Sequence, residues 1–109
     1  MSRRYDTFTH VGAATRTTSG QATGGIRCGE YIDGQLIVRC TGLGAGGTLT
    51  PYWQSSADGT SWGTLTRGST MIATGTQILS MAGGIGNYAK AAWVVATGAK
   101  FAMTFTFKE

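Results

Sequence analysis

Few residues of this sequence could carry out chemistry, and they do not cluster. There is one histidine, His10, and there are two cysteines, Cys28 and Cys40. A zinc ion usually takes four such ligands, so these three residues do not predict a metal site. No nucleophile stands beside a base in a known local motif, so we expect no enzymatic activity and no cofactor. The acidic residues are isolated along the chain: Asp6, Glu30, Asp33, Asp58 and Glu109.

One segment matches a nucleotide-binding motif by its letters. Residues 42–47, Gly-Leu-Gly-Ala-Gly-Gly, fit the pattern G-x-G-x-x-G. In dinucleotide-binding proteins a helix follows this pattern, because the helix N-terminus binds the pyrophosphate. Here the next residues, 48–53, include Pro51 and are typical of a strand. We therefore interpret residues 42–47 as a glycine-rich loop between two strands.

The two cysteines stand on either side of an expected turn at Asp33-Gly34. If this turn forms a hairpin, Cys28 and Cys40 face each other to within one residue of register, and a cross-strand disulfide is geometrically possible. The alternative is a pair of reduced, half-buried thiols, which suits a protein made in the cytoplasm. The sequence alone leaves both alternatives open.

Residues 52–62, Tyr-Trp-Gln-Ser-Ser-Ala-Asp-Gly-Thr-Ser-Trp, predict a tight hairpin. Asp58-Gly59 suits the positive backbone angles of its turn. The Asp58 carboxylate can accept hydrogen bonds from the backbone amides of the two residues that follow Gly59. Trp62 is expected to fold back onto the side of Trp53. We interpret these residues as a structural device that stabilises the hairpin.

The elements that must position these residues are strands, because apolar and polar residues alternate along most of the chain. The clearest strand is 101–108, with one core-facing row: Phe101, Met103, Phe105 and Phe107. The strand before it, 88–96, is joined to it by a short loop at 97–99, so the two are expected to pair as an antiparallel hairpin. Further strands are expected at 5–11, 25–31, 35–41, 48–55, 62–66, 69–73 and 77–81, with turns at 33–34, 58–59, 75 and 83–84.

The composition predicts a single domain over residues 1–109. Eighteen residues are glycine, and only 13% are charged. Glycine supplies the backbone angles of tight turns, and the many threonines favour strands over helices. About seven to nine short strands predict an all-β antiparallel sandwich or small barrel. Residues 12–25 have few bulky side chains, so we expect a long loop there or an extended N-terminal arm over 1–25.

The charge is basic, with a formal net value of +4 at pH 7. Arg3 and Arg4 near the N-terminus leave two alternatives open: a frayed, soluble terminus, or, together with Arg16, an arm that lies on an acidic neighbour. The other basic residues are scattered, so we expect no nucleic-acid partner. No segment is long and apolar enough to span a membrane, and no signal peptide opens the sequence, so we expect a protein made in the cytoplasm.

Two segments resemble parts of a known class of proteins. The pattern Gln-Ser-Ser-x-Asp-Gly-x-x-Trp over 54–62 resembles a turn found in small β-sandwich proteins of tailed-bacteriophage structural modules. The residues 87–98 and 101–107 are similar to the closing hairpin of those proteins. The resemblance implies a head decoration (cement) protein or a minor tail protein, a class without catalytic residues to transfer.

We therefore expect a virion structural protein that binds the major capsid protein lattice and stabilises the head. The resemblance also implies self-association, with a homotrimer as the expected form. One alternative is a minor tail or tail-tip protein. Another is a carbohydrate-binding or host-receptor-binding module, in which aromatic side chains would offer flat faces to sugar rings: Tyr52, Trp53, Trp62 and Trp93.

Overall fold

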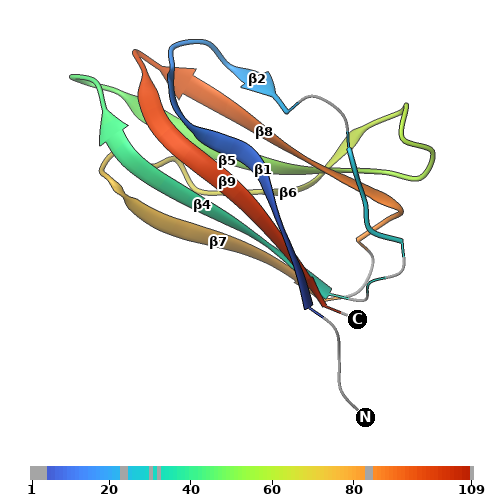
Figure 1. The fold of residues 1–109 in the computed structure, drawn as a ribbon. Coiled ribbons are helices and arrows are strands. Elements are labelled where there is room, and N and C mark those ends of the chain that lie inside the picture. Colours follow the sequence, from blue (N-terminus) through green and yellow to red (C-terminus); the bar gives the residue numbers. More distant parts are fainter. Residues whose placement is uncertain (1–4, 23–24, 30, 32, 83–84, 109) are drawn as a thin grey trace.

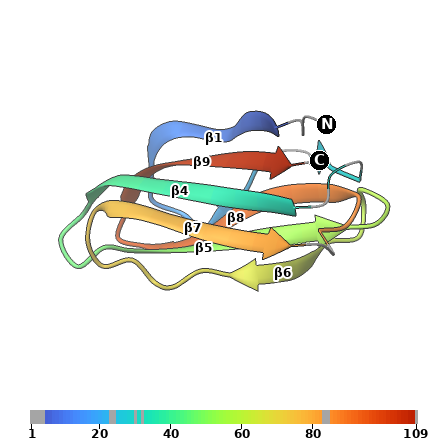
Figure 2. The same ribbon diagram turned by 90° about the horizontal axis from the view of Figure 1, so that it is seen from below.

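The computed structural model describes residues 5–22, 25–29, 31, 33–82 and 85–108. These residues form nine strands and no helix, arranged as two antiparallel sheets packed face to face (Figures 1 and 2). The first sheet has the order β1 (Tyr5–Arg16), β9 (Ala99–Lys108), β4 (Asp33–Leu43) and β7 (Gly75–Ala82). The second has the order β2 (Gly20–Gln21), β8 (Tyr88–Ala96), β5 (Thr48–Ser56) and β6 (Gly63–Arg67), with β3 (Ile26–Arg27) also paired to β8. The predicted antiparallel sandwich is confirmed.

The short strands β2 and β3 occupy one position in the second sheet. Gly20 of β2 lies opposite Trp93, and Ile26 of β3 lies opposite Ala89 of the same strand β8. Counted as one interrupted strand, they give each sheet four strands, and the chain alternates between the sheets except at the β5–β6 hairpin. This order is that of a jelly roll, a sandwich made from two Greek keys.

The core lies between the two sheets, and β9 supplies its largest share. Its alternate residues are fully buried, as the sequence predicts: Phe101, Met103, Phe105 and Phe107. Trp53 of β5 faces them from the other sheet, with its ring 5.2 Å from that of Phe105 in an edge-on contact. Complete burial of such a side chain stabilises the fold by about 1.5–3 kcal/mol. The threonines between these residues on β9 are only partly buried, so the strand has one inner and one outer face.

The prediction that residues 88–96 and 101–108 form a hairpin is wrong. β8 pairs with β5 in the second sheet, whereas β9 pairs with β1 and β4 in the first. The link at Thr97 and Gly98, which have φ angles of 69° and 147°, therefore turns the chain from one sheet into the other. Both strands face the same interior from opposite layers, and an alternating pattern does not distinguish this arrangement from a hairpin.

Asp33-Gly34 is not a turn, because both residues belong to the start of β4. Glycine is needed at position 34 for close packing, since a Cβ there would lie 2.7 Å from the Trp53 ring and 2.9 Å from the Phe107 ring. The strand predicted at 69–73 is also wrong: only Met71 makes a bridge, to Leu49 of β5. The other predicted strands are observed: 88–96 has the predicted ends, and the rest begin or end at different residues.

The expected N-terminal arm is wrong over residues 5–16. These residues form β1, which runs antiparallel to β9 from Tyr5 opposite Lys108 to Arg16 opposite Ala99. Gly20 and Gln21 then pair with β8. β1 changes register twice along β9, at bulges that twist the strand. The small side chains of this part of the sequence suit such an irregular edge strand. Arg3 and Arg4, the other part of the expected arm, lie outside the described residues.

Candidate binding and assembly surfaces

The turn between β5 and β6 is held together by Ser56 and Asp58. The Asp58 carboxylate accepts from the amides of Thr60 and Ser61, each at 2.8 Å, as predicted. The Ser56 hydroxyl donates to Asp58 Oδ1 at 3.0 Å and accepts from the Gly59 amide at 2.9 Å. The amides of Ser61 and Thr60, with the Ser56 hydroxyl, hold the pKa of Asp58 below its usual value. The carboxylate therefore stays charged and keeps the turn closed.

This turn is wider than the predicted two-residue turn. β5 ends at Ser56 and β6 begins at Gly63, and of the Asp58-Gly59 pair only Gly59 has a positive φ, of 81°. The prediction that Trp62 folds back onto Trp53 is wrong. Its ring lies on the outside, 4.3 Å from the ammonium nitrogen of Lys90, whereas Trp53 is in the core. The two tryptophans therefore belong to opposite faces of the sheet.

The outer face of the second sheet carries a shallow groove of about 410 Å³. We call it the outer groove. Ala92 lies opposite Tyr52 on adjacent strands, and its small side chain leaves space between larger neighbours. The guanidinium of Arg67 lies 5.6 Å from the Tyr52 ring centroid. The groove is lined by Ser19, Gly20, Gln21, Tyr52, Gln54, Thr64, Ala92, Trp93 and Val94.

Two of the four aromatic residues proposed for sugar binding line the outer groove. They are Tyr52, with a half-buried ring, and Trp93, whose indole N–H donates to the Thr18 carbonyl at 3.0 Å. Trp53 is fully buried in the core, and Trp62 does not line the groove. The sequence pattern shows that Tyr52 and Trp53 face opposite ways, but it does not show that residues 19–21 close one side of a groove.

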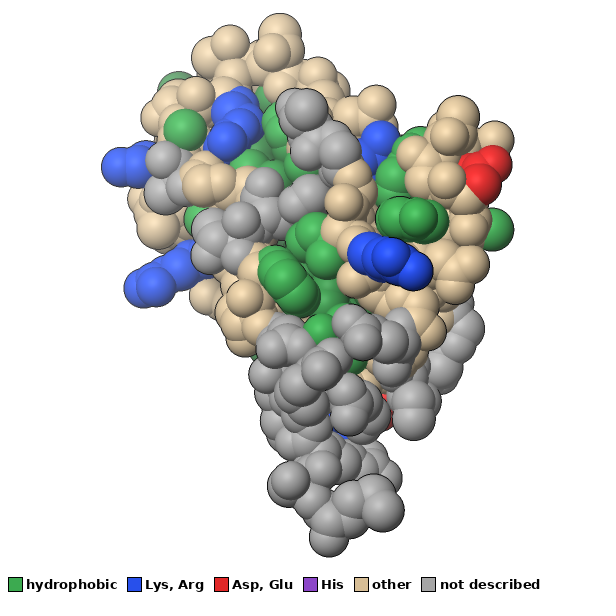
Figure 3. All heavy atoms as spheres, turned by 45° about the vertical axis from the view of Figure 1, so that its right-hand side comes forward, with side chains coloured by type: hydrophobic (Ala, Val, Ile, Leu, Met, Phe, Trp, Pro, Cys, Tyr) green, Lys and Arg blue, Asp and Glu red, His purple; other side chains and the backbone are tan. Residues whose placement is uncertain are grey.

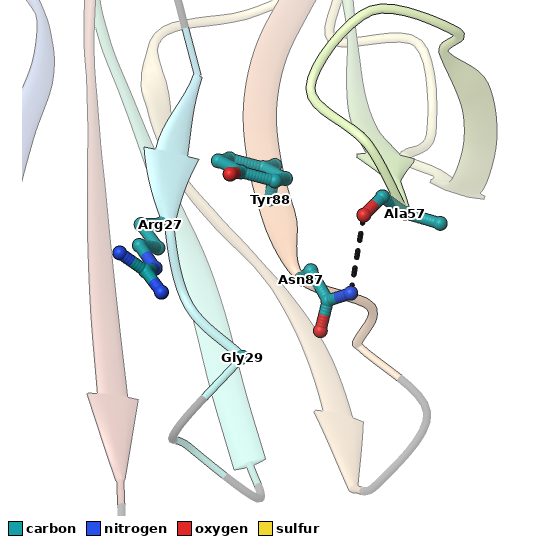
Figure 4. A pocket seen from close by; sticks show the side chains of 5 residues that line it. All are labelled: Arg27, Gly29, Ala57, Asn87 and Tyr88. Carbon is teal, nitrogen blue, oxygen red and sulfur yellow. Dashed lines mark hydrogen bonds between the residues drawn. The ribbon is translucent and has the colours of Figure 1, made fainter.

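A second cavity, of about 590 Å³, lies at the end of the sandwich near β3 and the start of β8. Figure 4 shows Arg27 and Tyr88 on neighbouring strands, with the Asn87 side chain directed at the loop after β5. The Asn87 amide donates to the Ala57 carbonyl at 3.1 Å. The cavity offers a guanidinium and an aromatic ring but no acid–base pair among the residues that line it, which include Gly29. The sequence analysis did not identify this cavity.

Among the described side chains, positive charges outnumber negative charges. Figure 3 shows hydrophobic side chains gathered between lysine and arginine side chains, with few acidic ones. Asp33 and Asp58 are the acidic residues whose side chains the structure describes. Seven positive side chains are described: Arg16, Arg27, Arg39, Arg67, Lys90, Lys100 and Lys108. This excess favours partners with acidic surfaces.

Within the described ranges, no group of three His, Cys, Asp or Glu residues could hold a metal ion, and no helix is long and apolar enough to cross a membrane.

Cys28 and Cys40 are free, buried thiols, so the disulfide alternative is not formed. Cys28 lies at the end of the sandwich, where its thiol approaches the Gly86 carbonyl at 3.6 Å. Cys40 lies far along β4, opposite Phe101, and roughly 20 Å of extended strand separates it from the Asp33 end. Burial raises the pKa of the Cys28 thiol to about 11. The thiol is therefore neutral at physiological pH and poorly reactive.

Arg16, the one proposed arm residue that the structure describes, is bound to its own domain. Its guanidinium lies 4.9 Å from the Phe101 ring centroid and 5.2 Å from that of Trp93. It donates to the carbonyls of Phe101 at 3.3 Å and Gly12 at 3.1 Å. These contacts fix the end of β1 against the sandwich, so Arg16 is not free to reach a neighbour.

Comparison with known proteins shows the fold. No protein-family model matches the sequence, and neither does any curated protein. The chain is similar to one in the structure "Bacillus endospore appendages form a novel family of disulfide-linked pili", with a TM-score of 0.62, 11% identity, and coverage of 98% of this chain and 87% of the other. It is also similar to a chain in "Structure of infectious bursal disease virus Gx strain", with a TM-score of 0.55, 11% identity, and coverage of 99% of this chain and 33% of that chain.

Proposed function

We propose that this protein is a structural subunit of a virion, and that it decorates a capsid by binding the major capsid protein lattice. The observation that carries the proposal is the jelly-roll sandwich itself, which is similar over nearly its whole length to a subunit of pili and to a third of a virion chain. Jelly rolls recur in viral capsids, but the same fold serves other tasks. The proposed partner is therefore what an experiment must test.

The interior of the sandwich supports a mechanical role. Side chains from both sheets fill it, so any partner must bind on the outside, at the faces, edges or loops. The basic excess among the described side chains would attract an acidic lattice, and the rigid domain would bridge neighbouring capsid subunits. In this mechanism the binding free energy opposes separation of those subunits, which stabilises the head.

The test is co-sedimentation of the purified protein with capsids that lack it. We expect saturable binding, a loss of binding as salt is raised, and a higher disruption temperature of the decorated capsid. Lys100→Glu with Arg39→Glu, two exposed changes on strands of the first sheet, should weaken binding if that face contacts the lattice. Arg67→Glu on the second sheet is the matched control. Absence of saturable binding to capsids would contradict the proposal.

A tail or tail-tip location remains the nearest alternative, since the same fold would serve in a ring of subunits. Purified tails in the same sedimentation assay separate the two: binding to tails and not to heads favours the tail. The homotrimer implied by the phage resemblance is tested by the mass of the free protein in solution.

A carbohydrate-binding or receptor-binding module is the second candidate, and the outer groove is the observation that favours it. Tyr52 supplies an aromatic face for a sugar ring, and Gln54 and Thr64 supply hydrogen-bonding groups beside it. A glycan array with the wild-type protein and Tyr52→Ala tests this function. If the wild-type protein binds a glycan, Tyr52→Ala abolishes that binding, and the protein does not bind capsids, then the sugar-binding function replaces the capsid proposal.

A further inference from the structure

The strand β7 forms an open edge of the first sheet. It pairs with β4 on one side, from Gly75 opposite Cys40 to Ala82 opposite Asp33, with no shift of register over eight residue pairs. On its other side, no strand of the described chain pairs with it, and Figures 1 and 2 show it at the border of the sheet. Such an edge presents a row of unpaired backbone amides and carbonyls, to which another strand can add.

The edge also lacks the features that usually prevent strand addition. Residues 68–89 contain no Asp, Glu, Lys, Arg or Pro, although Arg67 and Lys90 flank them directly. Ile78, at the middle of β7, is 54% exposed, and Ile72 in the preceding segment is 79% exposed. Charges, prolines and bulges are the common means of protecting an edge, and β7 has none of the three.

The other edges of the sandwich are protected. β1 has register shifts at Val11 along β9, and bulges turn a strand away from flat pairing. β6 has only five residues, a register shift against β5 and a charged end at Arg67. β2 and β3 have two residues each. β7 is therefore the edge on which a long, regular strand could add.

We propose that β7 of one copy pairs antiparallel with β7 of a second copy, about a two-fold axis at Ile78. In this register Ile78 lies opposite Ile78, and Thr76 lies opposite Ser80 on both sides of the axis. All three residues are exposed on the outer face of the free sheet. The pairing packs the two Ile78 side chains against each other and places each Thr76 hydroxyl next to a Ser80 hydroxyl. Both kinds of cross-strand pair stabilise a sheet. It joins two first sheets into one continuous sheet.

Charge favours a second copy as the occupant. The chain has a net charge of +4, so two copies repel each other over most of their surfaces. The 22 residues between Arg67 and Lys90 carry no charge, so pairing of two β7 strands brings no like charges of those strands together. An acidic partner would instead be drawn to the basic residues elsewhere. When the same edge of two copies pairs about a two-fold axis, both edges are used and no third copy can add there. This surface therefore makes a dimer and does not explain a trimer.

Sedimentation velocity of the full chain over a range of concentrations tests the proposal without any capsid. We expect a monomer–dimer equilibrium that strengthens as salt rises, because salt screens the repulsion between the basic copies. Binding to an acidic capsid should weaken with salt. The two assays are independent, so failure of one is distinguishable from failure of the other.

The decisive variant is Ile78→Lys, which places two positive charges opposite each other and should weaken dimerisation by about tenfold or more. Val94→Lys is the matched control, because Val94 is 47% exposed on a strand of the other sheet. It should dimerise as the wild type does. Circular dichroism and the unfolding midpoint establish that both variants fold.

An equimolar mixture of Ile78→Lys and Ile78→Glu should restore a mixed dimer, because opposite charges then face each other across the axis. A wild type that stays monomeric, a wild-type trimer, or an Ile78→Lys variant that dimerises normally would each overturn the proposal. Failure of the mixture to dimerise would overturn the register with Ile78 at the axis.

Discussion

Trp53 and Tyr52 are neighbours on β5, yet their side chains lie on opposite faces of the second sheet. Trp53 is fully buried, and its ring contacts Phe105 at 5.2 Å and Phe107 at 6.3 Å between centroids. Tyr52 is half-buried on the outside, where its contact is the guanidinium of Arg67 at 5.6 Å. The inner face is an aromatic layer shared by the two sheets, whereas the outer face carries separate cation–aromatic pairs.

The inner-face residues therefore determine the stability of the fold, whereas the outer-face residues are available for contact with partners. Changes on the inner face must disturb both sheets, because each inner side chain packs against residues of the opposite layer. Changes on the outer face affect one or two neighbours, so that face can vary in chemistry without loss of the fold. We expect partners to be recognised by outer residues, edges and loops, and substitutions on the two faces to differ in size of effect.

The largest effect is expected for Trp53→Ala. Removal of this fully buried ring should lower the free energy of unfolding by about 3–5 kcal/mol, because it leaves a cavity between the sheets. Trp53→Phe should cost less, since the indole N–H is buried without a partner among the described residues. Denaturant unfolding measures both, with Tyr52→Ala as the control from the outer face. Equal losses for Trp53→Ala and Tyr52→Ala would contradict the distinction between the faces.

Gly34→Ala tests the inner face by adding volume. The new methyl group would lie 2.7 Å from the Trp53 ring and 2.9 Å from the Phe107 ring, so the core must shift. We expect a loss of about 1–3 kcal/mol, the usual cost of overpacking. Gly63→Ala on β6 is the matched control, because a Cβ there meets nothing within 4 Å. A neutral Gly34→Ala in denaturant unfolding would show that the two sheets can separate easily.

The outer face holds two cation–aromatic pairs that should differ in strength. Lys90 is 7% exposed, with its nitrogen 4.3 Å from the Trp62 ring, whereas Arg67 is exposed above Tyr52. Double-mutant cycles with Lys90→Met and Trp62→Leu should give a coupling of about 2 kcal/mol, against about 0.5–1 kcal/mol for Arg67→Met and Tyr52→Leu. The reverse order would show that burial does not strengthen the Lys90 pair.

Several parts of the fold could be predicted because alternation is a local property. The row from Phe101 to Phe107 and the opposition of Tyr52 and Trp53 follow from side chains that point to opposite faces of a strand. The hydrogen bonds that the Asp58 carboxylate accepts from the Thr60 and Ser61 amides also depend on residues close in sequence. These features are correct in the sequence analysis because nothing distant decides them.

The parts that could not be predicted depend on contacts between distant residues. Alternation in 88–96 and 101–108 indicates an inner face for each strand but not that they lie in different sheets. Gly34 resembles a turn residue by type, and only the approach of Trp53 and Phe107 shows that it is a packing position. The outer groove combines residues 19–21 with β5, β6 and β8, and no local pattern indicates that they meet.

The smallest effect is expected at the turn that leads from β5 to β6, where Asp58 is fully exposed. Hydrogen bonds from the Ser61 and Thr60 amides, and from Ser56, hold the pKa of Asp58 below its ordinary 3.8, so the folded state binds this proton less readily than the unfolded chain. The stabilisation is therefore present above pH 3.8 and is lost as the pH falls through the lowered pKa.

Asp58→Asn isolates this contribution, because asparagine can accept the same amide hydrogen bonds but does not titrate. The unfolding midpoints of wild type and variant, measured from neutral pH down to strongly acidic pH, should converge as Asp58 becomes protonated. The other carboxyl groups titrate in both proteins, so the difference between the two curves belongs to Asp58. Parallel curves would mean that the charge of Asp58 does not stabilise the turn, and that the hydroxyl of Ser56 and the backbone suffice to close it.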